Sequence, residues 1–399
     1  MPQVEERLCN PVSPAELERR WASVRSRMRE AGMDALVIQG ANALAGGGSY
    51  FRWLTGTVVA TSYPQTAIFP AEGLMTLVHH GDLGGEFHTA RGDPAHPGVG
   101  KRLTTPAFPT VVYTGRYEAQ IAAREISKNG FRTVGLVGAM MMYHGFGAAL
   151  KELLGAVTFL DATEMVDLLK ATKSAEDIAA IRRAAAMQDE ILVRVRDYIR
   201  PGMRDFEIMA HAQHVGQTLG SETGYFLGSS APPGQAAMLR PRPQQGRLVR
   251  DGDVFLFQAE NTGPGGFFVH LARFFVLGKA PQELVDGFGA MIEAQQHTLQ
   301  LLKPGAACRE IFAAYNSYMR SRGLQEERRL HCHGQGYEPV ERPLVRNDET
   351  MTIAENMNIG IHPSFANERL FVTVCDNFLT GAGGSVERLH STPQTIIEL

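Results

Sequence analysis

The first part of the chain alternates between helical and strand spacing of its apolar residues. Leu17, Trp21, Val24 and Met28 recur at intervals of three or four within residues 13–32, which predicts an amphipathic helix. Short apolar runs bounded by Gly and Pro predict strands at residues 34–39, 65–69, 75–79, 110–113 and 133–137, with a helix at residues 117–128 among them. The alternation indicates a small α/β domain that covers residues 1–160.

The pattern changes after Asp161, where a long helical stretch begins. Ser174 fits the position of a helix N-cap, and Glu176 and Asp177 follow in the first turn, where acidic side chains interact favourably with the helix dipole. Helical spacing continues to about Leu219. Beyond it, the pattern predicts strands at residues 254–258, 267–276, 357–362 and 371–379 and helices at residues 281–302 and 308–322. We therefore expect a second domain, of α+β class, over residues 161–399.

Composition and charge narrow the classes of partner. The 399 residues are 44% hydrophobic and 20% charged, which is enough for two buried cores. A formal net charge of -3 argues against nucleic acid and anionic membranes as partners, because both normally require a concentrated basic face. No window approaches the roughly 20 apolar residues of a transmembrane helix, and the N-terminus is polar rather than signal-like. The four cysteines lack the paired spacing of a disulfide framework or a C-x-x-C motif: Cys9, Cys308, Cys332 and Cys375. We therefore expect a protein of the reducing cytoplasm.

Several segments, taken in order, resemble the pita-bread family that includes creatinase, aminopeptidase P and prolidase. Residues 16–38 are similar to the opening of a creatinase-type N-terminal domain, and residues 50–56 to its tyrosine-leucine-threonine-glycine strand. Residues 173–184 resemble the first helix of the catalytic domain, which Arg200-Pro201-Gly202 would end. The resemblance spans nearly the whole chain. It implies an α/β N-terminal domain, a pita-bread C-terminal domain and a homodimer.

The catalytic motifs of the family also have counterparts. Residues 263–278 resemble its metal-binding hairpin, and His333-Gly334-Gln335-Gly336 matches its H-G-x-G motif. Residues 356–363 and 374–380 resemble the two strands that normally carry glutamate ligands. The family's peptidases hold two metal ions with two Asp, one His and two Glu, because carboxylates can bridge divalent ions that activate water. An ungapped alignment places those positions on Ala259, His270, His333, His362 and Cys375, with Glu260 beside the first.

Only His333 is unchanged among these positions, and the second histidine of the peptidases aligns with Val340. A two-ion peptidase is therefore not expected. Imidazole and thiolate are good ligands for Zn or Fe, but three neutral imidazoles add no negative charge. We expect at most one divalent ion, held by His270, His333 and His362 with Glu260 or Cys375 as a fourth ligand. The alternative is a metal-free site in which the histidines act as acid and base.

Two further residues are catalytic candidates besides the three histidines and Glu260. Arg273 keeps the family's position three residues after the hairpin ligand, where it could orient a carboxylate. Glu341 follows the H-G-x-G motif and, like Glu260, is a candidate base. Ordinary ion pairs are the competing interpretation for all three side chains.

Three classes of function remain open. Residues 257–275 resemble the dimethylsulfoniopropionate lyase branch of the family, with Gln258 and Glu260 at comparable positions. The first hypothesis is a lyase that cleaves a C–C or C–S bond of a small hydrophobic or aromatic substrate by elimination or by retro-aldol release of a small aldehyde. The second is a creatinase-like or ectoine-hydrolase-like C–N hydrolase. The third is a non-catalytic binding protein, which predicts no accessible cavity around the three histidines.

Overall fold

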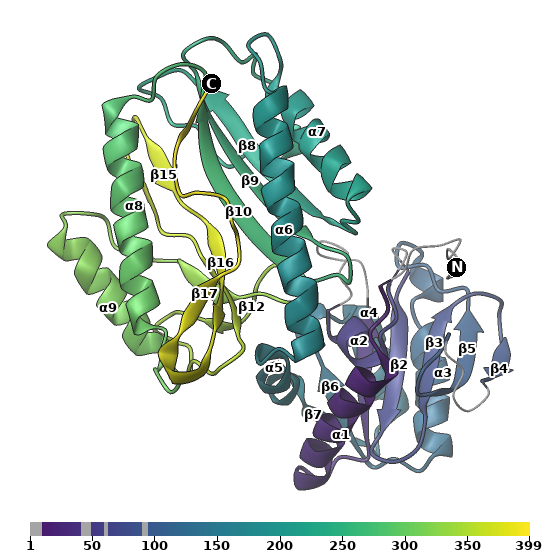
Figure 1. The fold of residues 1–399 in the computed structure, drawn as a ribbon. Helices are drawn as coiled ribbons and strands as arrows, with labels where there is room; N and C mark the ends of the chain where they lie inside the picture. Colours follow the sequence, from purple (N-terminus) through teal and green to yellow (C-terminus); the bar gives the residue numbers. More distant parts are fainter. Residues whose placement is uncertain (1–9, 41–48, 60–62, 90–94) are drawn as a thin grey trace, which may run out of the picture. The chain divides into compact units, whose positions relative to one another are not determined.

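The computed structural model describes residues 10–40, 49–59, 63–89 and 95–399 (Figure 1), so Cys9 lies outside the described residues. The chain forms two compact units, residues 1–170 and 171–399. Helix α5, Thr163–Ala171, closes the N-terminal unit, whereas we expected the first domain to end near residue 160. None of the helices in the described part of the chain combines the length and apolarity needed to cross a membrane.

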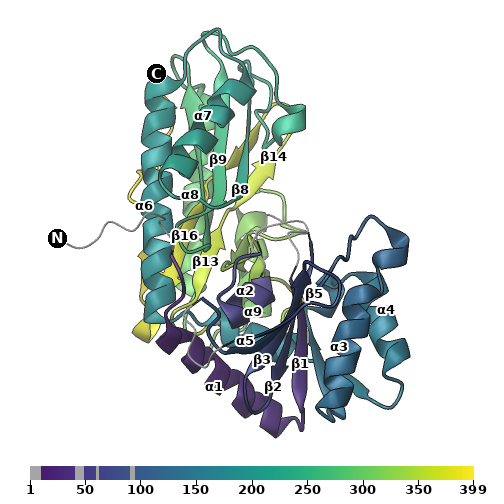
Figure 2. The same ribbon diagram turned by 90° about the vertical axis from the view of Figure 1, so that its right-hand side faces the viewer.

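The N-terminal unit is built on a mixed seven-stranded sheet in the order β4-β5-β3-β2-β1-β6-β7. Its strands are β1 Ala35–Gly40, β2 Gln65–Pro70, β3 Met75–His80, β4 Glu86–His88, β5 Val99–Thr105, β6 Thr133–Val137 and β7 Thr158–Asp161. Its other helices are α1 Pro14–Glu30, α2 Ser49–Thr55, α3 Tyr117–Lys128 and α4 His144–Leu153. Helices α3 and α4 share a core with β1, β2 and β6, and α1 and α2 lie on the other side of the sheet (Figure 2). The predicted α/β class is confirmed.

Helix α1 illustrates how local sequence determines this unit. The backbone N–H of Glu16 donates a hydrogen bond to the Ser13 hydroxyl at 3.2 Å, which caps the helix. Leu17, Val24 and Met28 are buried, as their spacing predicts. The strand predicted at residues 110–113 is wrong: the segment forms a short turn, η1 Val112–Thr114, in which Val112 is 95% exposed. An apolar run with no core to face does not form a strand.

The C-terminal unit contains two larger sheets and one strand pair, ordered β18-β10-β9-β8, β12-β11-β13-β16-β17 and β14-β15. The strands are β8 Gly224–Ala231, β9 Val254–Thr262, β10 Phe268–Val276, β11 Cys332–Gly334, β12 Glu341–Leu344, β13 Asn358–Ile361, β14 Ser364–Ala366, β15 Phe371–Thr373, β16 Asp376–Thr380, β17 Val386–Arg388 and β18 Ile397–Glu398. The helices are α6 Ala175–Tyr198, α7 Asp205–Thr218, α8 Gln282–Leu301 and α9 Cys308–Ser321. The single strand predicted over residues 371–379 is two strands, β15 and β16, in different sheets.

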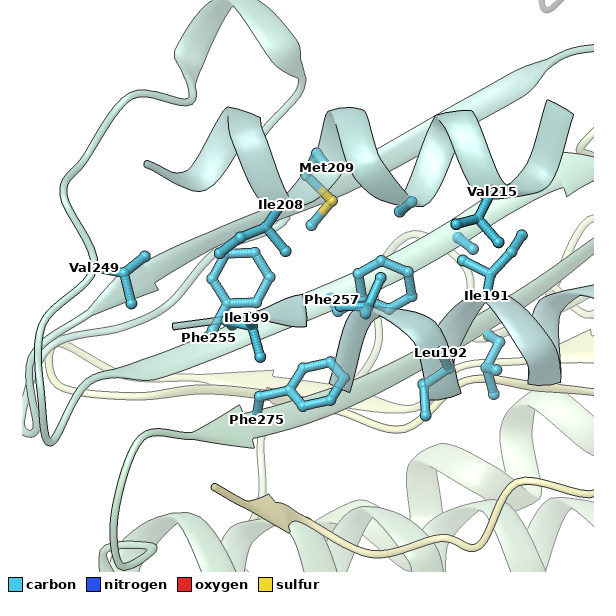
Figure 3. Close-up of a cluster of buried hydrophobic side chains, with 14 of the residues drawn as sticks. Ile191, Leu192, Ile199, Ile208, Met209, Val215, Val249, Phe255, Phe257 and Phe275 are labelled. Carbon is cyan, nitrogen blue, oxygen red and sulfur yellow. The ribbon is translucent and has the colours of Figure 1, made fainter. Parts of the chain in front are cut away.

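Strand alternation divides the β9–β10 hairpin into two faces. Phe255, Phe257 and Phe275 point into a core formed with helices α6 and α7 (Figure 3). Leu256 and Phe274, on the opposite face, pack in a second core with α8. The second face continues along the hairpin toward Glu260 and His270, beyond the end of that core. Polar side chains at this end therefore face away from α6 and α7.

Candidate functional site

A carboxyl, an amide and an imidazole share the second face of the β9–β10 hairpin. Glu260 lies directly opposite His270, and Gln258 is two residues from Glu260, so all three side chains project to one side. Gln258 Nε2 donates a hydrogen bond to Glu260 Oε2 at 3.2 Å, and His270 Nδ1 lies 4.0 Å from Glu260 Oε1. Ala259, where the ungapped alignment put the first ligand, packs in the α6–α7 core instead. The hairpin thus turns Glu260 into the site.

His333 and His362 come from the adjoining sheet. His333 lies on β11 opposite Gly360 of β13, and His362 directly follows β13. The ring centroids of His270, His333 and His362 lie 5.1 to 5.4 Å apart. The backbone N–H of His270 donates to Asn377 Oδ1 at 2.8 Å, which joins the hairpin to β16, the strand beside β13. The structure therefore brings together the three histidines that the sequence singled out.

Burial controls the protonation of this cluster. It lowers the pKa of His333 to about 3 and that of His362 to about 4, and it lowers the pKa of His270 well below its usual value. All three imidazoles are therefore neutral at pH 7. Burial raises the pKa of the Glu260 carboxyl to about 7, against smaller opposing effects from the Gln258 hydrogen bond and the Arg329 charge. A carboxyl with this pKa can both accept and donate a proton near neutral pH.

These side chains border a cavity of about 360 Å³. Its polar lining also includes Glu327, Arg329, Ser364 and Thr373, which sequence reasoning missed. Arg329 lies four residues before His333, but no motif contains it, and charge runs such as residues 326–329 usually indicate only a solvated surface. The cavity contradicts the expectation for a non-catalytic scaffold, which was that no accessible space surrounds the histidines.

The remaining candidates lie elsewhere. Arg273 is three residues from His270, so alternation places it on the opposite face of β10, where its guanidinium pairs with Asp376 at 2.7 Å and donates to backbone carbonyls. Glu341 pairs with Lys173 at 3.2 Å and does not line the cavity. The Cys375 thiol lies 3.8 Å from the His270 carbonyl oxygen, also outside the cavity lining. Arg273, Glu341 and Cys375 therefore lie outside the lining of the cavity.

The donor set does not fit the two-ion centre that the resemblance implies. Three neutral imidazoles and one glutamate provide little negative charge to offset two dications. His270 Nε2 packs against Gly360, where a built Cβ would lie 2.0 Å away, and burial raises the pKa of Cys375 well above its usual value, which keeps the thiol protonated. Among the described residues, no group of three or more His, Cys, Asp or Glu side chains is arranged to hold an ion.

Comparison with known proteins agrees with this fold. The curated relatives include an uncharacterized hydrolase/peptidase, y4tM, from Sinorhizobium fredii, 25% identical over 294 residues, 71% of this chain and 74% of the relative. An ectoine hydrolase from Halomonas elongata is 25% identical over 331 residues, 79% of each chain. The crystal structure of recombinant prolidase from Thermococcus sibiricus matches with a TM-score of 0.79 and 19% identity, covering 96% of this chain and 99% of that one.

None of these three comparisons shows the proposed likeness to the dimethylsulfoniopropionate lyase branch. The model of the Creatinase/Prolidase N-terminal domain matches residues 20–171. The model of Metallopeptidase family M24 matches residues 179–387, more than half of the chain. Both domains of the expected architecture are therefore present. The chain belongs to Metallopeptidase family M24, with a creatinase/prolidase N-terminal domain and a pita-bread C-terminal domain.

Proposed function

We propose that this enzyme hydrolyses a carbon–nitrogen bond of a small, non-peptide substrate with side chains in place of the family's two metal ions. The observation that carries the proposal is the position of Glu260. Its carboxyl lies mostly buried at the cavity, next to His270 and hydrogen-bonded to Gln258, and has a pKa of about 7. Such a group suits both proton transfers of a hydrolysis.

In this reaction, Glu260 accepts a proton from water while the water oxygen attacks the carbon of the C–N bond. The C–N bond then breaks, and the same carboxyl returns the proton to the departing nitrogen, which leaves as an amine. Neutral His333 and His362 orient the water and the substrate by hydrogen bonds, because imidazoles with pKa values of about 3 and 4 do not compete for the transferred proton. Atoms and protons balance without a further reactant.

Hydrolysis is favoured over the lyase hypothesis by the relatives rather than by the cavity. Either reaction could begin with a proton transfer to Glu260. The Halomonas elongata relative is named an ectoine hydrolase, and the Sinorhizobium fredii relative an uncharacterized hydrolase/peptidase. No observation at this site specifically supports elimination. Release of an amine distinguishes the two reactions, because cleavage of a C–C or C–S bond releases none.

The test is an amine-release assay over a panel of N-acyl and cyclic amidine compounds, with the wild type and Glu260→Gln. We expect the variant to lose roughly 10²- to 10⁴-fold in rate, the usual contribution of a general base. Glu326→Gln is the matched control, because Glu326 pairs with Arg320 on the surface and does not line the cavity. Full activity of Glu260→Gln would overturn the proposal.

We also propose a homodimer, as the resemblance to creatinase and prolidase implies. Sedimentation analysis at micromolar concentration tests this. A sedimentation coefficient that corresponds to 43.6 kDa would contradict it.

A further inference from the structure

We infer that Arg329 binds a carboxylate of the substrate, so that the cavity takes small carboxylates with an apolar body. This inference rests on the proposed function, because it concerns the ligand of the same cavity. Arg329 is the only Lys or Arg among the residues that line the cavity in the described part of the chain. A guanidinium presents a planar fork of donors that matches the two oxygens of a carboxylate.

Four other arginines within residues 320–346 have carboxylate partners, and Arg329 does not. Within the described residues, its guanidinium makes no hydrogen bond or ion pair. The paired neighbours are Arg320 with Glu326, Arg322 with Glu293, Arg342 with Glu349 and Arg346 with Asp348. The donors of Arg329 are therefore available to a ligand, whereas those of these four arginines are already used.

Glu327 borders the same cavity but does not neutralise Arg329. Its Oε1 accepts hydrogen bonds from the backbone N–H groups of Arg329 and Leu330, at 2.6 and 2.9 Å. The carboxylate thus fixes the backbone of the segment that carries Arg329. Because Glu327 accepts from these two backbone donors, its carboxylate does not pair with the guanidinium of Arg329.

The charge of Arg329 acts on the reactive side of the cavity. After burial, it is the largest cause of the lowered pKa of His362, and it also lowers the pKa of His333 and of Glu260. A carboxylate bound at Arg329 therefore lies within electrostatic range of the groups that carry out the reaction. It would place the rest of the ligand against them.

Five apolar side chains line the cavity beside its polar and charged groups. Leu227, Leu239, Leu330, Val340 and Phe371 border the cavity between the charged groups. These five side chains provide contacts for an apolar part of the ligand, while the polar groups orient it. The ligand that fits this arrangement has a carboxylate for Arg329, an apolar body, and a C–N bond near Glu260.

The test measures binding of three carboxylates and their neutral amides by calorimetry: N-benzoylglycine, benzoate and 4-phenylbutyrate. We expect the wild type to bind at least one acid roughly 10- to 100-fold more tightly than its amide, which is the contribution of a charge-assisted hydrogen bond. Arg329→Gln should lose this preference, and Arg329→Lys should retain part of it. Arg328→Gln is the control, because Arg328 is exposed and does not line the cavity.

The inference is overturned if no acid binds, if acid and amide bind equally, or if Arg329→Gln keeps the preference. A Glu260→Gln variant separates this result from the proposed function. The Glu260→Gln variant should still bind the acid more tightly than its amide, even if the proposed C–N hydrolysis is wrong. Conversely, amine release from neutral substrates alone would leave the role of Glu260 intact and remove that of Arg329.

Discussion

The imidazole of His270 packs against the Cα of Gly360, and a Cβ built on Gly360 would lie 2.0 Å from His270 Nε2. Gly360 pairs with His333 across β11 and β13, and His362 is two residues further along. The absence of a side chain at residue 360 therefore creates the space in which the His270 ring meets the other two. The histidine cluster depends on this glycine.

Gly360→Ala should displace the His270 ring. The added methyl meets a ring packed within a buried site, so we expect a loss of about 1–3 kcal/mol in the free energy of unfolding, measured by urea denaturation. Gly289→Ala is the control: no atom lies within 4 Å of the added Cβ, and alanine is favoured in the interior of helix α8. Equal stability of the two variants would show that His270 is not held against Gly360.

Arg273 should contribute to stability rather than to the reaction. Arg273→Met removes the closest cation from the buried Asp376, which keeps the Gln394 hydrogen bond and Arg388 at 3.6 Å. The loss should cost about 3 kcal/mol in the free energy of unfolding. Arg182→Met removes an exposed ion pair with Glu387 and should cost less than about 1 kcal/mol. A stable Arg273→Met protein that has lost only its activity would restore Arg273 to the list of catalytic candidates.

The N-terminal unit should be destabilised as the pH rises from 4.5 to 7. Burial raises the pKa of the Glu118 carboxyl from 4.5 to about 7, although hydrogen bonds from Thr66 and Gln39 act in the opposite direction. The folded state therefore holds this proton more tightly than the unfolded state. The stabilisation is complete below pH 4.5, decreases through this range and is lost above pH 7.

The difference amounts to roughly 3 kcal/mol, because each tenfold change in proton affinity is worth about 1.4 kcal/mol. Glu118→Gln removes the titrating group, so its thermal unfolding should depend less on pH across this range. Identical pH profiles for the variant and the wild type would contradict the role given to Glu118.

The enzyme should not release the N-terminal residue from Xaa-Pro peptides when Mn, Co or Zn is added. In the pita-bread peptidases that this chain resembles, carboxylates bind the metal ions. Here His270, His362 and Cys375 occupy three of those carboxylate positions, and Val340 replaces the second histidine. A dipeptide assay with each metal tests this. Turnover on the order of 1 per second, ordinary for an enzyme, would contradict the account.

The sequence predicted most of the fold and the histidine cluster because both depend on local patterns. The helix at residues 117–128 and the strand at residues 133–137 match α3 and β6, since their apolar residues reach a core. His270, His333 and His362 were recognised from motif positions. Glu260 rather than Ala259 faces the site because the register of the hairpin decides the direction of each side chain. An ungapped alignment of sequences gives no information on how the two strands of the hairpin pair.

The parts that could not be predicted depend on contacts between distant segments. One feature was local: residues 270 and 273 lie on opposite faces of one strand, so Arg273 and His270 do not face the same side. The pairing of Glu341 with Lys173 joins residues 168 positions apart, and nothing in either local sequence indicates it. Arg329 belongs to no motif, and only the folded structure shows that Arg329 lines the cavity whereas Arg328 does not.

The metal content of the purified protein tests the central claim most directly, which is that the family's two-ion centre has been replaced. Protein prepared without chelator or affinity-column metal, and then dialysed against excess Mn or Zn, should hold no more than one equivalent by elemental analysis, because His270, His333, His362 and Glu260 offer too little negative charge for two adjacent dications. Two bound equivalents, lost together in a Glu260→Gln variant, would contradict it.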